Sequence, residues 1–302
     1  MRFAHKLQVG WYVSVFMVCF FVVWSLSTET LKSDVDLLYT RRYALMSYLS
    51  IMGIEGIAQS TFFVQGAQRL AQSWIRHVPA TGRMQYDMVL LVTDPYGLLN
   101  AKSVVLLRDV GWILIKVDPL YGIPSASAYL FQNHYSHTAQ FTKLHMWTFE
   151  RYEHILYLDS DMLVMKDILS TVSNFYNNTS DKLGVARNRA RDDSFNADGS
   201  YTFNAGLMYI TPSRKEFVKM SKAALYTEYD VLLQEQAFLQ VYWANRTFFM
   251  PSALNQFVDG LMADCMVMHF ISTLKPWFIC PFFSGHEDAC SEWDSYRLKR
   301  TL

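Results

Sequence analysis

The sequence predicts an α/β fold built on an open, mostly parallel, Rossmann-like sheet. The chain has 302 residues, of which 51% are hydrophobic. It can therefore bury a sizeable core, and its length suits one large domain or about one and a half domains of ordinary size. Apolar runs at residues 43–51, 87–93 and 112–117 alternate with segments of helical periodicity. Such alternation is typical of parallel sheets whose strands are joined by right-handed helical crossovers.

One transmembrane helix is expected to precede this fold. Arg2, His5 and Lys6 stand before an uncharged apolar run from Leu7 to Leu26. A helix of this length spans a hydrocarbon core of about 30 Å, and the preceding positive charge favours a cytosolic amino terminus. A cleaved signal peptide is the alternative, because Ser25-Leu-Ser27 resembles a cleavage site, although the apolar region of signal peptides is usually shorter.

These features predict a single-pass type II membrane protein of the Golgi or the endoplasmic reticulum, with its folded domain in the lumen. The expected parts are a cytosolic tail (1–6), a transmembrane signal anchor (7–26), a stem (27–41) and the folded domain (42–302). With 27 basic and 27 acidic residues, the net charge is zero, so no overall field would attract nucleic acid.

The folded domain is expected to begin with strands and helices in alternation. Residues 61–76 have apolar side chains at helical spacing, and a turn at 94–97 separates the next strand from the next helix. The expected elements are strands at 43–51, 87–93 and 112–117 and helices at 61–76 and 98–109.

The second half of the domain is expected to continue the same pattern. An amphipathic helix over 140–152 carries Lys143 and leads directly into the apolar run 154–165. The remaining expected elements are strands at 184–187, 203–210 and 267–270 and a helix at 232–243.

Two acids interrupt the run from His154 to Met165, namely Asp159 and Asp161. A buried strand that ends in acids delivers them to the edge of the sheet where open α/β sheets bind ligands. Two carboxylates one residue apart can share Mg²⁺ or Mn²⁺, which complete their coordination with substrate phosphates. The pattern favours a metal-nucleotide site, and a strand-end turn with solvated acids is the alternative.

Four further motifs surround this pair in a fixed order. They are Phe141–Tyr152 upstream and then Phe203-Asn-Ala-Gly206, Glu235-Gln236 and His269–Trp277 downstream. This succession resembles glycosyltransferase family 8, the glycogenin-like retaining glycosyltransferases, in a membrane-anchored form. The resemblance implies a nucleotide-diphospho-sugar transferase fold of the GT-A type. It also implies a UDP-sugar donor and an acceptor that is a carbohydrate, a lipid or a protein.

The resemblance implies a metal site and a set of catalytic residues. Asp159 and Asp161 would hold the metal with His269, and imidazole favours Mn²⁺ over Mg²⁺. The implied catalytic residues are Lys275, near the diphosphate, and Gln236 and Glu235, near the reacting carbon. The sequence leaves open whether one of the last two acts as a nucleophile or whether the acceptor attacks from the front face.

The resemblance also implies a set of substrate-binding residues. The family holds uridine with its first strand and the following helix, and a Phe here would replace the base-stacking tyrosine. The implied substrate-binding residues are Lys143, Ser160, Asn204, Gly206 and Phe63, with Phe62 as the alternative to Phe63.

Two other functions compete with this interpretation. A haloacid-dehalogenase-like phosphohydrolase also carries Asp-x-Asp after an apolar strand, but Leu163 stands where that family usually has Thr or Val. The other alternative is a catalytically weak or inactive relative that serves as a sugar-binding or partner subunit. The absence of the usual Thr-Asn-Asp-x-Tyr-like segment near the first strand favours this alternative, and Asp159, Asp161, His269 and Lys275 argue against it.

The cysteines and the glycosylation sequons agree with a lumenal domain. Cys19 lies in the apolar run and Cys265 in an apolar segment, which leaves Cys280 and Cys290 as a plausible disulfide. Acceptor sequons begin at Asn177, Asn178 and Asn245.

Overall fold

The computed structural model describes residues 33–52, 54–123, 139–175, 181–187, 203–258, 263–271, 275–280 and 287–296. The expected tail, the expected anchor at 7–26 and the sequons at Asn177 and Asn178 lie outside these ranges. Within the described ranges, no helix combines the length and the apolar character that a membrane span requires.

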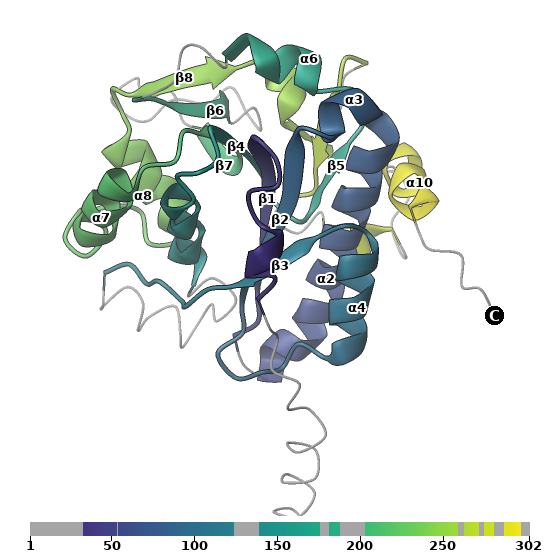
Figure 1. Ribbon diagram of the computed structural model, residues 1–302, viewed down its shortest axis with the longest axis horizontal. Helices are drawn as coiled ribbons and strands as arrows, with labels where there is room; N and C mark the ends of the chain where they lie inside the picture. The colour runs from purple at the N-terminus through teal and green to yellow at the C-terminus, as the bar shows by residue number, and fades with distance from the viewer. Residues whose placement is uncertain are drawn as a thin grey trace, which may run out of the picture.

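A seven-stranded sheet forms the centre of the molecule (Figure 1), in the order β3-β2-β1-β4-β7-β6-β8. Neighbouring strands are parallel except around β7, which runs antiparallel to both β4 and β6. The open, mostly parallel sheet predicted from the sequence is therefore confirmed. The strands are β1 (Tyr43–Ser50), β2 (Tyr86–Thr93), β3 (Ile113–Lys116), β4 (His154–Leu158), β6 (Leu183–Arg187), β7 (Phe203–Ile210) and β8 (Thr247–Met250).

A second, three-stranded sheet has the order β5-β10-β9. Its strands are β5 (Met162–Val164), β9 (Gln256–Phe257) and β10 (Val267–His269). The predicted run 154–165 is thus two strands in different sheets, because the chain turns between them with the Met162 amide donating to the Asp159 carbonyl at 3.2 Å. The strand predicted at 267–270 is β10, and it pairs with β5 and β9 in this second sheet.

Helices cover both faces of the central sheet. Figure 1 shows α2 and α4 on one side and α7 and α8 on the other. The α-helices are α2 (Ile54–His77), α3 (Ala80–Arg83), α4 (Ala101–Asp109), α6 (Leu169–Val172), α7 (Arg214–Ala223), α8 (Gln234–Tyr242), α9 (Pro276–Ile279) and α10 (Glu287–Ser295). The 3₁₀ helices are η1 (Val35–Leu37), η3 (Gln140–Thr148), η4 (Ser173–Phe175) and η5 (Ser252–Leu254).

The alternation of side chains along β1 divides the core into two clusters. Leu45 and Leu49 pack into the cluster that contains Trp74 of α2. Met46 points to the opposite face, into the cluster that contains Phe238 of α8. Because successive strand residues face opposite sides, an almost wholly apolar strand such as β1 must be covered on both.

Several predicted helices have different bounds in the structure. The helix predicted at 61–76 is α2, which begins at Ile54. α4 begins at Ala101 rather than at residue 98, because the Asn100 side chain caps it by accepting from the Ser103 amide at 2.9 Å. The segment predicted as an amphipathic helix over 140–152 is the 3₁₀ helix η3, which ends at Thr148. Most of its residues are buried, so tertiary packing rather than one apolar face determines its conformation.

The described part of the expected stem lies against the domain. Asp34 accepts from the Leu114 amide of β3 at 3.0 Å and pairs with Arg108 of α4 at 2.6 Å. Asp87, which is 4% exposed, accepts from the Thr40 amide at 3.0 Å and from the Tyr152 hydroxyl at 2.7 Å. Residues 33–40 are therefore fastened to the folded domain.

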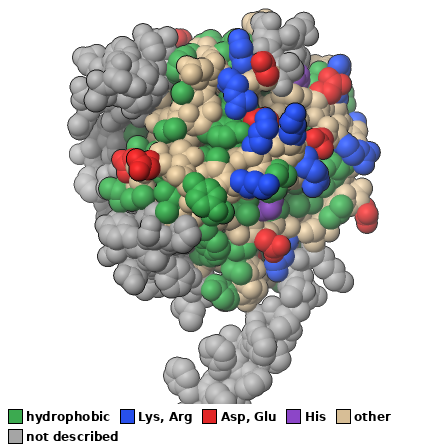
Figure 2. Space-filling view, turned by 90° about the vertical axis from the view of Figure 1, so that its left-hand side faces the viewer, with side chains coloured by type: hydrophobic (Ala, Val, Ile, Leu, Met, Phe, Trp, Pro, Cys, Tyr) green, Lys and Arg blue, Asp and Glu red, His purple; other side chains and the backbone are tan. Residues whose placement is uncertain are grey.

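The side of the molecule formed by α7 and α8 carries many basic side chains, which Figure 2 shows gathered on one part of that face. Lys215 and Lys222 of α7 are exposed there. Lys219 and Arg246 both pair with Glu216, at 2.7 and 3.3 Å. Acids thus neutralise part of this face, in line with a net charge of zero.

The predicted disulfide is confirmed. Cys280, which follows α9, is bonded to Cys290 of α10, with α-carbons 5.2 Å apart. The bond joins α10 to the chain just after Lys275, and α10 contributes Trp293 to a small apolar cluster with Phe270. Cys265 is free and buried.

Candidate functional site

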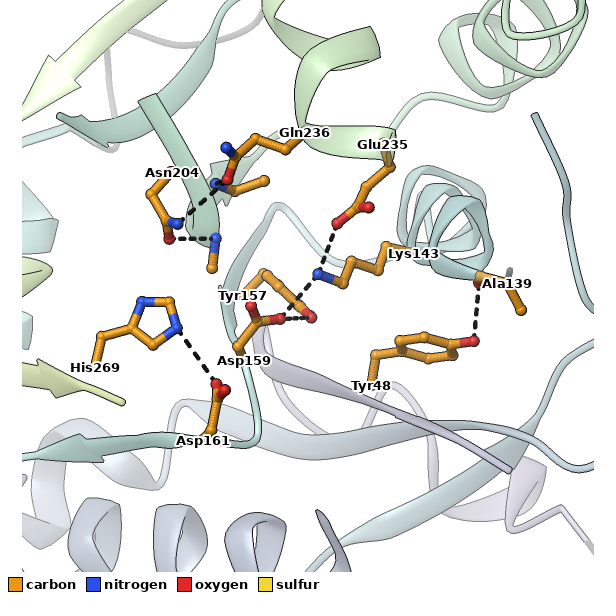
Figure 3. A network of polar contacts seen from close by, with 12 residues as sticks. Tyr48, Ala139, Lys143, Tyr157, Asp159, Asp161, Asn204, Glu235, Gln236 and His269 are labelled. Carbon is orange, nitrogen blue, oxygen red and sulfur yellow. Dashed lines mark hydrogen bonds and ion pairs between the residues drawn. The ribbon is translucent and has the colours of Figure 1, made fainter. Parts of the chain in front are cut away.

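Three of the predicted site residues converge although distant parts of the chain supply them. Asp159 follows β4, Asp161 precedes β5, and His269 ends β10. One ligand atom from each lies within 4.8 Å of the others (Figure 3). His269 Nε2 lies 3.4 Å from Asp161 Oδ1. Among the described residues, this is the group of acids and histidines that could hold a metal ion.

Backbone hydrogen bonds at the ends of strand pairs in both sheets hold the three residues in place. The Asp159 amide donates to the Gly206 carbonyl of β7 at 2.8 Å, and the Phe270 amide donates to the Asp161 carbonyl at 3.1 Å. His269 is the register partner of Met162 in the antiparallel pairing of β10 with β5. The site therefore lies where the turn from β4 to β5 passes from the large sheet to the small one.

The donor atoms fit a hard divalent cation. Asp161 Oδ1 is buried and has no hydrogen-bond partner among the described residues. A buried carboxylate oxygen without a partner is costly, and coordination of a cation would satisfy it. Two carboxylates and one imidazole suit Mn²⁺ better than Mg²⁺.

Gly206 makes room for this group of ligands. A Cβ atom at this position would lie 2.5 Å from His269 Cε1 and 3.0 Å from Asp159 Oδ2. It would also lie 2.7 Å from Asn204 Oδ1. Only glycine lets β7 approach the three ligands so closely.

Lys275 contacts the metal-ligand group directly. Its Nζ forms an ion pair with Asp161 Oδ2 and donates to the Phe270 carbonyl at 2.8 Å. Burial would raise the pKa of Asp161, but the Lys275 ammonium and His269 outweigh this effect and hold that pKa below its usual range. Asp161 is therefore a carboxylate, as a metal ligand must be.

A second network lies beside Asp159. Lys143 Nζ is 2.8 Å from Glu235 Oε1 and 3.0 Å from Asp159 Oδ1, and the Tyr157 hydroxyl also donates to Asp159 Oδ1. Burial would lower the pKa of Lys143, but the two carboxylates raise it well above its ordinary value. Burial raises the pKa of Glu235, and the Lys143 ammonium opposes that shift. Lys143 thus stays charged between two acids.

The amides of Asn204 and Gln236 also meet. Asn204 Nδ2 donates to Gln236 Oε1 at 3.2 Å, and the Ala205 amide donates to the same oxygen at 3.0 Å. Asn204 Oδ1 accepts from the Gly206 amide at 2.9 Å. The start of β7 therefore fixes both side chains next to Asp159 and His269 (Figure 3).

Ser160 and Phe63 lie beside the candidate site rather than within the metal-ligand group. Ser160 is buried in the turn between the two aspartates, and its carbonyl oxygen would lie 2.3 Å from a Cβ at Gly66 of α2. Phe63 packs edge-on against Trp277 with ring centroids 5.0 Å apart, and Phe62 stacks on the same ring at 5.8 Å. Both phenylalanines thus contact the helix that follows Lys275.

Sequence reasoning missed two residues of the site. Tyr157 lies two residues before Asp159 and so shares its side of the strand, a signal that could have identified it. Asn255 Oδ1 lies 3.0 Å from His269 Nδ1 and its Nδ2 donates to Asn204 at 3.2 Å. Nothing local marks Asn255, because it lies 14 residues from His269 and 51 from Asn204.

The family model described as glycosyl transferase family 8 matches residues 67–279. No curated protein matches the chain.

Several solved structures share the fold. The galactosyltransferase LgtC, solved with donor and acceptor sugar analogues, is 16% identical, with a TM-score of 0.52 over 83% of this chain and 95% of that one. The WbbM bifunctional glycosyltransferase is 14% identical, with a TM-score of 0.55 over 85% of this chain and 50% of the WbbM chain. Mouse xyloside xylosyltransferase 1 is 13% identical, with a TM-score of 0.50 over 75% of this chain and 96% of the mouse chain.

Proposed function

Because the chain belongs to glycosyl transferase family 8, we propose that it transfers a sugar from a UDP-sugar to a hydroxyl group of an acceptor, with retention of the anomeric configuration. The observation that carries this proposal is the convergence of Asp159, Asp161 and His269 within 4.8 Å beside Lys275. The family membership also decides against the phosphohydrolase considered above.

Asp159, Asp161 and His269 would hold Mn²⁺ against the diphosphate of the donor. When bound, the cation would neutralise the charge that builds on the diphosphate as the glycosidic bond breaks. Lys275, which lies against Asp161, would bring a second positive charge to the same phosphates. Electrophilic help at the leaving group is often the largest contribution to such catalysis.

Lys143, Glu235, Asn204 and Gln236 would surround the donor sugar. Gln236 Oε1 already accepts two hydrogen bonds, so its Nε2 group is the part that would face the substrate. Glu235 is buried and ion-paired with Lys143, which makes its carboxylate a poor nucleophile. We therefore favour attack by the acceptor from the front face. The acceptor oxygen bonds to the anomeric carbon on the side from which UDP departs, and its proton passes to the departing phosphate oxygen.

The proposal is tested by screening Mn²⁺-dependent hydrolysis of UDP-sugars across the common donors. Asp161→Asn keeps the shape of the side chain but removes one negative charge, so we expect weaker Mn²⁺-dependent donor binding and a larger loss of turnover. Lys275→Ala should lower turnover by about 10²–10³-fold. An Asp161→Asn protein that binds and turns over the donor normally would show that the site is elsewhere. Binding without turnover of any donor by the wild-type protein would support the inactive relative instead.

We further propose that residues 7–26 anchor the catalytic domain in the lumen of the Golgi or the endoplasmic reticulum. The uncharged run and its basic flank support this topology. Asn245 is exposed and begins a sequon, so a lumenal domain can be glycosylated there. Endoglycosidase should increase the gel mobility of the protein made in eukaryotic cells, and Asn245→Gln should reduce that shift. A normally inserted protein with no shift would contradict the topology.

A further inference from the structure

We infer that Asn255 is a positioning residue that holds His269 in the tautomer needed for metal binding and joins it to Gln236 through Asn204. The inference rests on the proposed function, since it assigns His269 to the metal and Gln236 to the donor sugar. Four side chains, His269, Asn255, Asn204 and Gln236, form one chain of hydrogen bonds across the site.

Two backbone amides of β7 set the direction of this chain, because a backbone N–H group can only donate. The Gly206 amide donates to Asn204 at 2.9 Å, so the atom of Asn204 that faces it is the carbonyl oxygen. The Ala205 amide donates to Gln236 at 3.0 Å, which fixes the oxygen of Gln236 in the same way. The Asn204 NH₂ group then points to the Gln236 oxygen, 3.2 Å away, and the two assignments agree.

The orientation of Asn204 determines that of Asn255. Asn204 Oδ1 also faces Asn255 at 3.2 Å, and an acceptor oxygen requires a donor there, so Asn255 presents its NH₂ group. Asn255 Oδ1 is therefore directed at His269 Nδ1, 3.0 Å away. Only a protonated Nδ1 can donate to that oxygen.

The His269 tautomer follows from this contact. With the proton on Nδ1, Nε2 carries the lone pair, and Nε2 is the nitrogen that lies 3.4 Å from Asp161 Oδ1. A metal-binding histidine commonly donates its other ring N–H group to a second residue, which fixes the ring and the tautomer. Asn255 and His269 are 0% and 3% exposed, so no bulk water can replace either partner.

The far end of the chain orients Gln236. Its oxygen is occupied by Asn204 and Ala205, so its NH₂ group is directed away from them. If Asn204 moved, the Gln236 amide would lose this orientation. Asn255 therefore supports the metal ligand His269 with its oxygen and, through Asn204, the substrate-facing amide of Gln236 with its nitrogen.

The test uses histidine labelled with ¹⁵N in the full-length protein, without metal and at about pH 8, where an ordinary imidazole is neutral. Two-bond ¹H–¹⁵N spectra distinguish the tautomers, and the His269 signal among the 8 histidines is the one missing from His269→Gln. We expect the Nδ1–H tautomer in the wild-type protein. Asn255→Leu has a similar volume and no hydrogen bond, so it should mix the tautomers and weaken the binding of Mn²⁺ alone by about 10–100-fold.

Asn255→Asp separates the two functions of the residue. A carboxylate still accepts from His269 but cannot donate to Asn204, so the tautomer and the Mn²⁺ affinity should be retained while kcat for the donor falls. Gln256→Leu is the matched control, because Gln256 is a neighbouring buried amide that contacts Asp264 instead. It should leave both the tautomer and the affinity unchanged.

The Nε2–H tautomer in the wild-type protein would overturn the inference, even if Asn255→Leu fails to fold. An unchanged tautomer and Mn²⁺ affinity in folded Asn255→Leu would also overturn it. These measurements need no transferase activity. The predicted tautomer in a protein that cleaves no UDP-sugar would therefore refute the proposed function and leave the role of Asn255 standing.

Discussion

The ammonium of Lys143 lies 2.8 Å from Oε1 of Glu235, although 92 residues separate the two in the chain. Both side chains are buried, at 5% exposure each. The contact joins η3 on one side of the site to α8 on the other, and Lys143 also contacts Asp159. Lys143 therefore connects the expected donor-sugar residues to the expected metal ligands.

Replacing Lys143 by methionine should destabilise the metal-free protein by about 3–5 kcal/mol, because it leaves the buried Glu235 and the partly exposed Asp159 without their counter-charge. Urea unfolding in the presence of a chelator measures the effect. Lys219→Met is the control, since Lys219 pairs with Glu216 at the surface and should contribute about 0–1 kcal/mol. Equal losses in the two variants would mean that the buried pair has no special role.

Tyr157→Phe should weaken Mn²⁺ binding by about tenfold without unfolding the protein. Burial and Asp159 raise the pKa of Tyr157 well above its ordinary value, so the phenol keeps its proton and donates to Asp159. The phenylalanine variant leaves Asp159 Oδ1 without this hydrogen bond. Calorimetric titration with Mn²⁺ checks the result, and Tyr48→Phe is the control because Tyr48 donates to the Ala139 carbonyl instead. Unaltered affinity in Tyr157→Phe would contradict the role of its hydroxyl.

Gly206→Ala should abolish Mn²⁺ binding, because the new methyl group would overlap His269 and press on Asp159. Gly97→Ala is a suitable comparison. Gly97 has φ +66° and no atom within 4 Å of an added Cβ, so alanine there should cost about 1–2 kcal/mol of stability through backbone strain alone. Free Mn²⁺ measured by electron paramagnetic resonance should fall on adding Gly97→Ala and stay constant on adding Gly206→Ala.

The disulfide predicts a particular pattern of alkylation in the full-length protein that carries Cys19→Ser and is made in the secretory pathway of eukaryotic cells. When the protein is unfolded without reductant, only Cys265 should react with the alkylating reagent. When reductant is present, Cys280 and Cys290 should react as well. In the native protein Cys265 should be inert near neutral pH, because burial raises its pKa to about 12. Mass spectrometry counts the labels. Reaction of all three thiols without reductant would rule out the bond.

The sequence by itself determined the first three strands of the central sheet and the position of the acidic pair. β1, β2 and β3 follow from apolar runs, because a strand buried on both faces needs apolar residues throughout. The Asp159 and Asp161 pair follows from the polarity change at the end of such a run. These are local signals, and local patterns can be read without the fold.

Tertiary structure decided which distant side chains meet. The sequence does not record that β10 pairs with β5, and that pairing brings His269 beside Asp161. Nor does it record that Asn255 reaches both His269 and Asn204. Hydrogen bonds between distant residues depend on where the backbone carries each atom to within a fraction of an ångström, and only the packed sheets determine that.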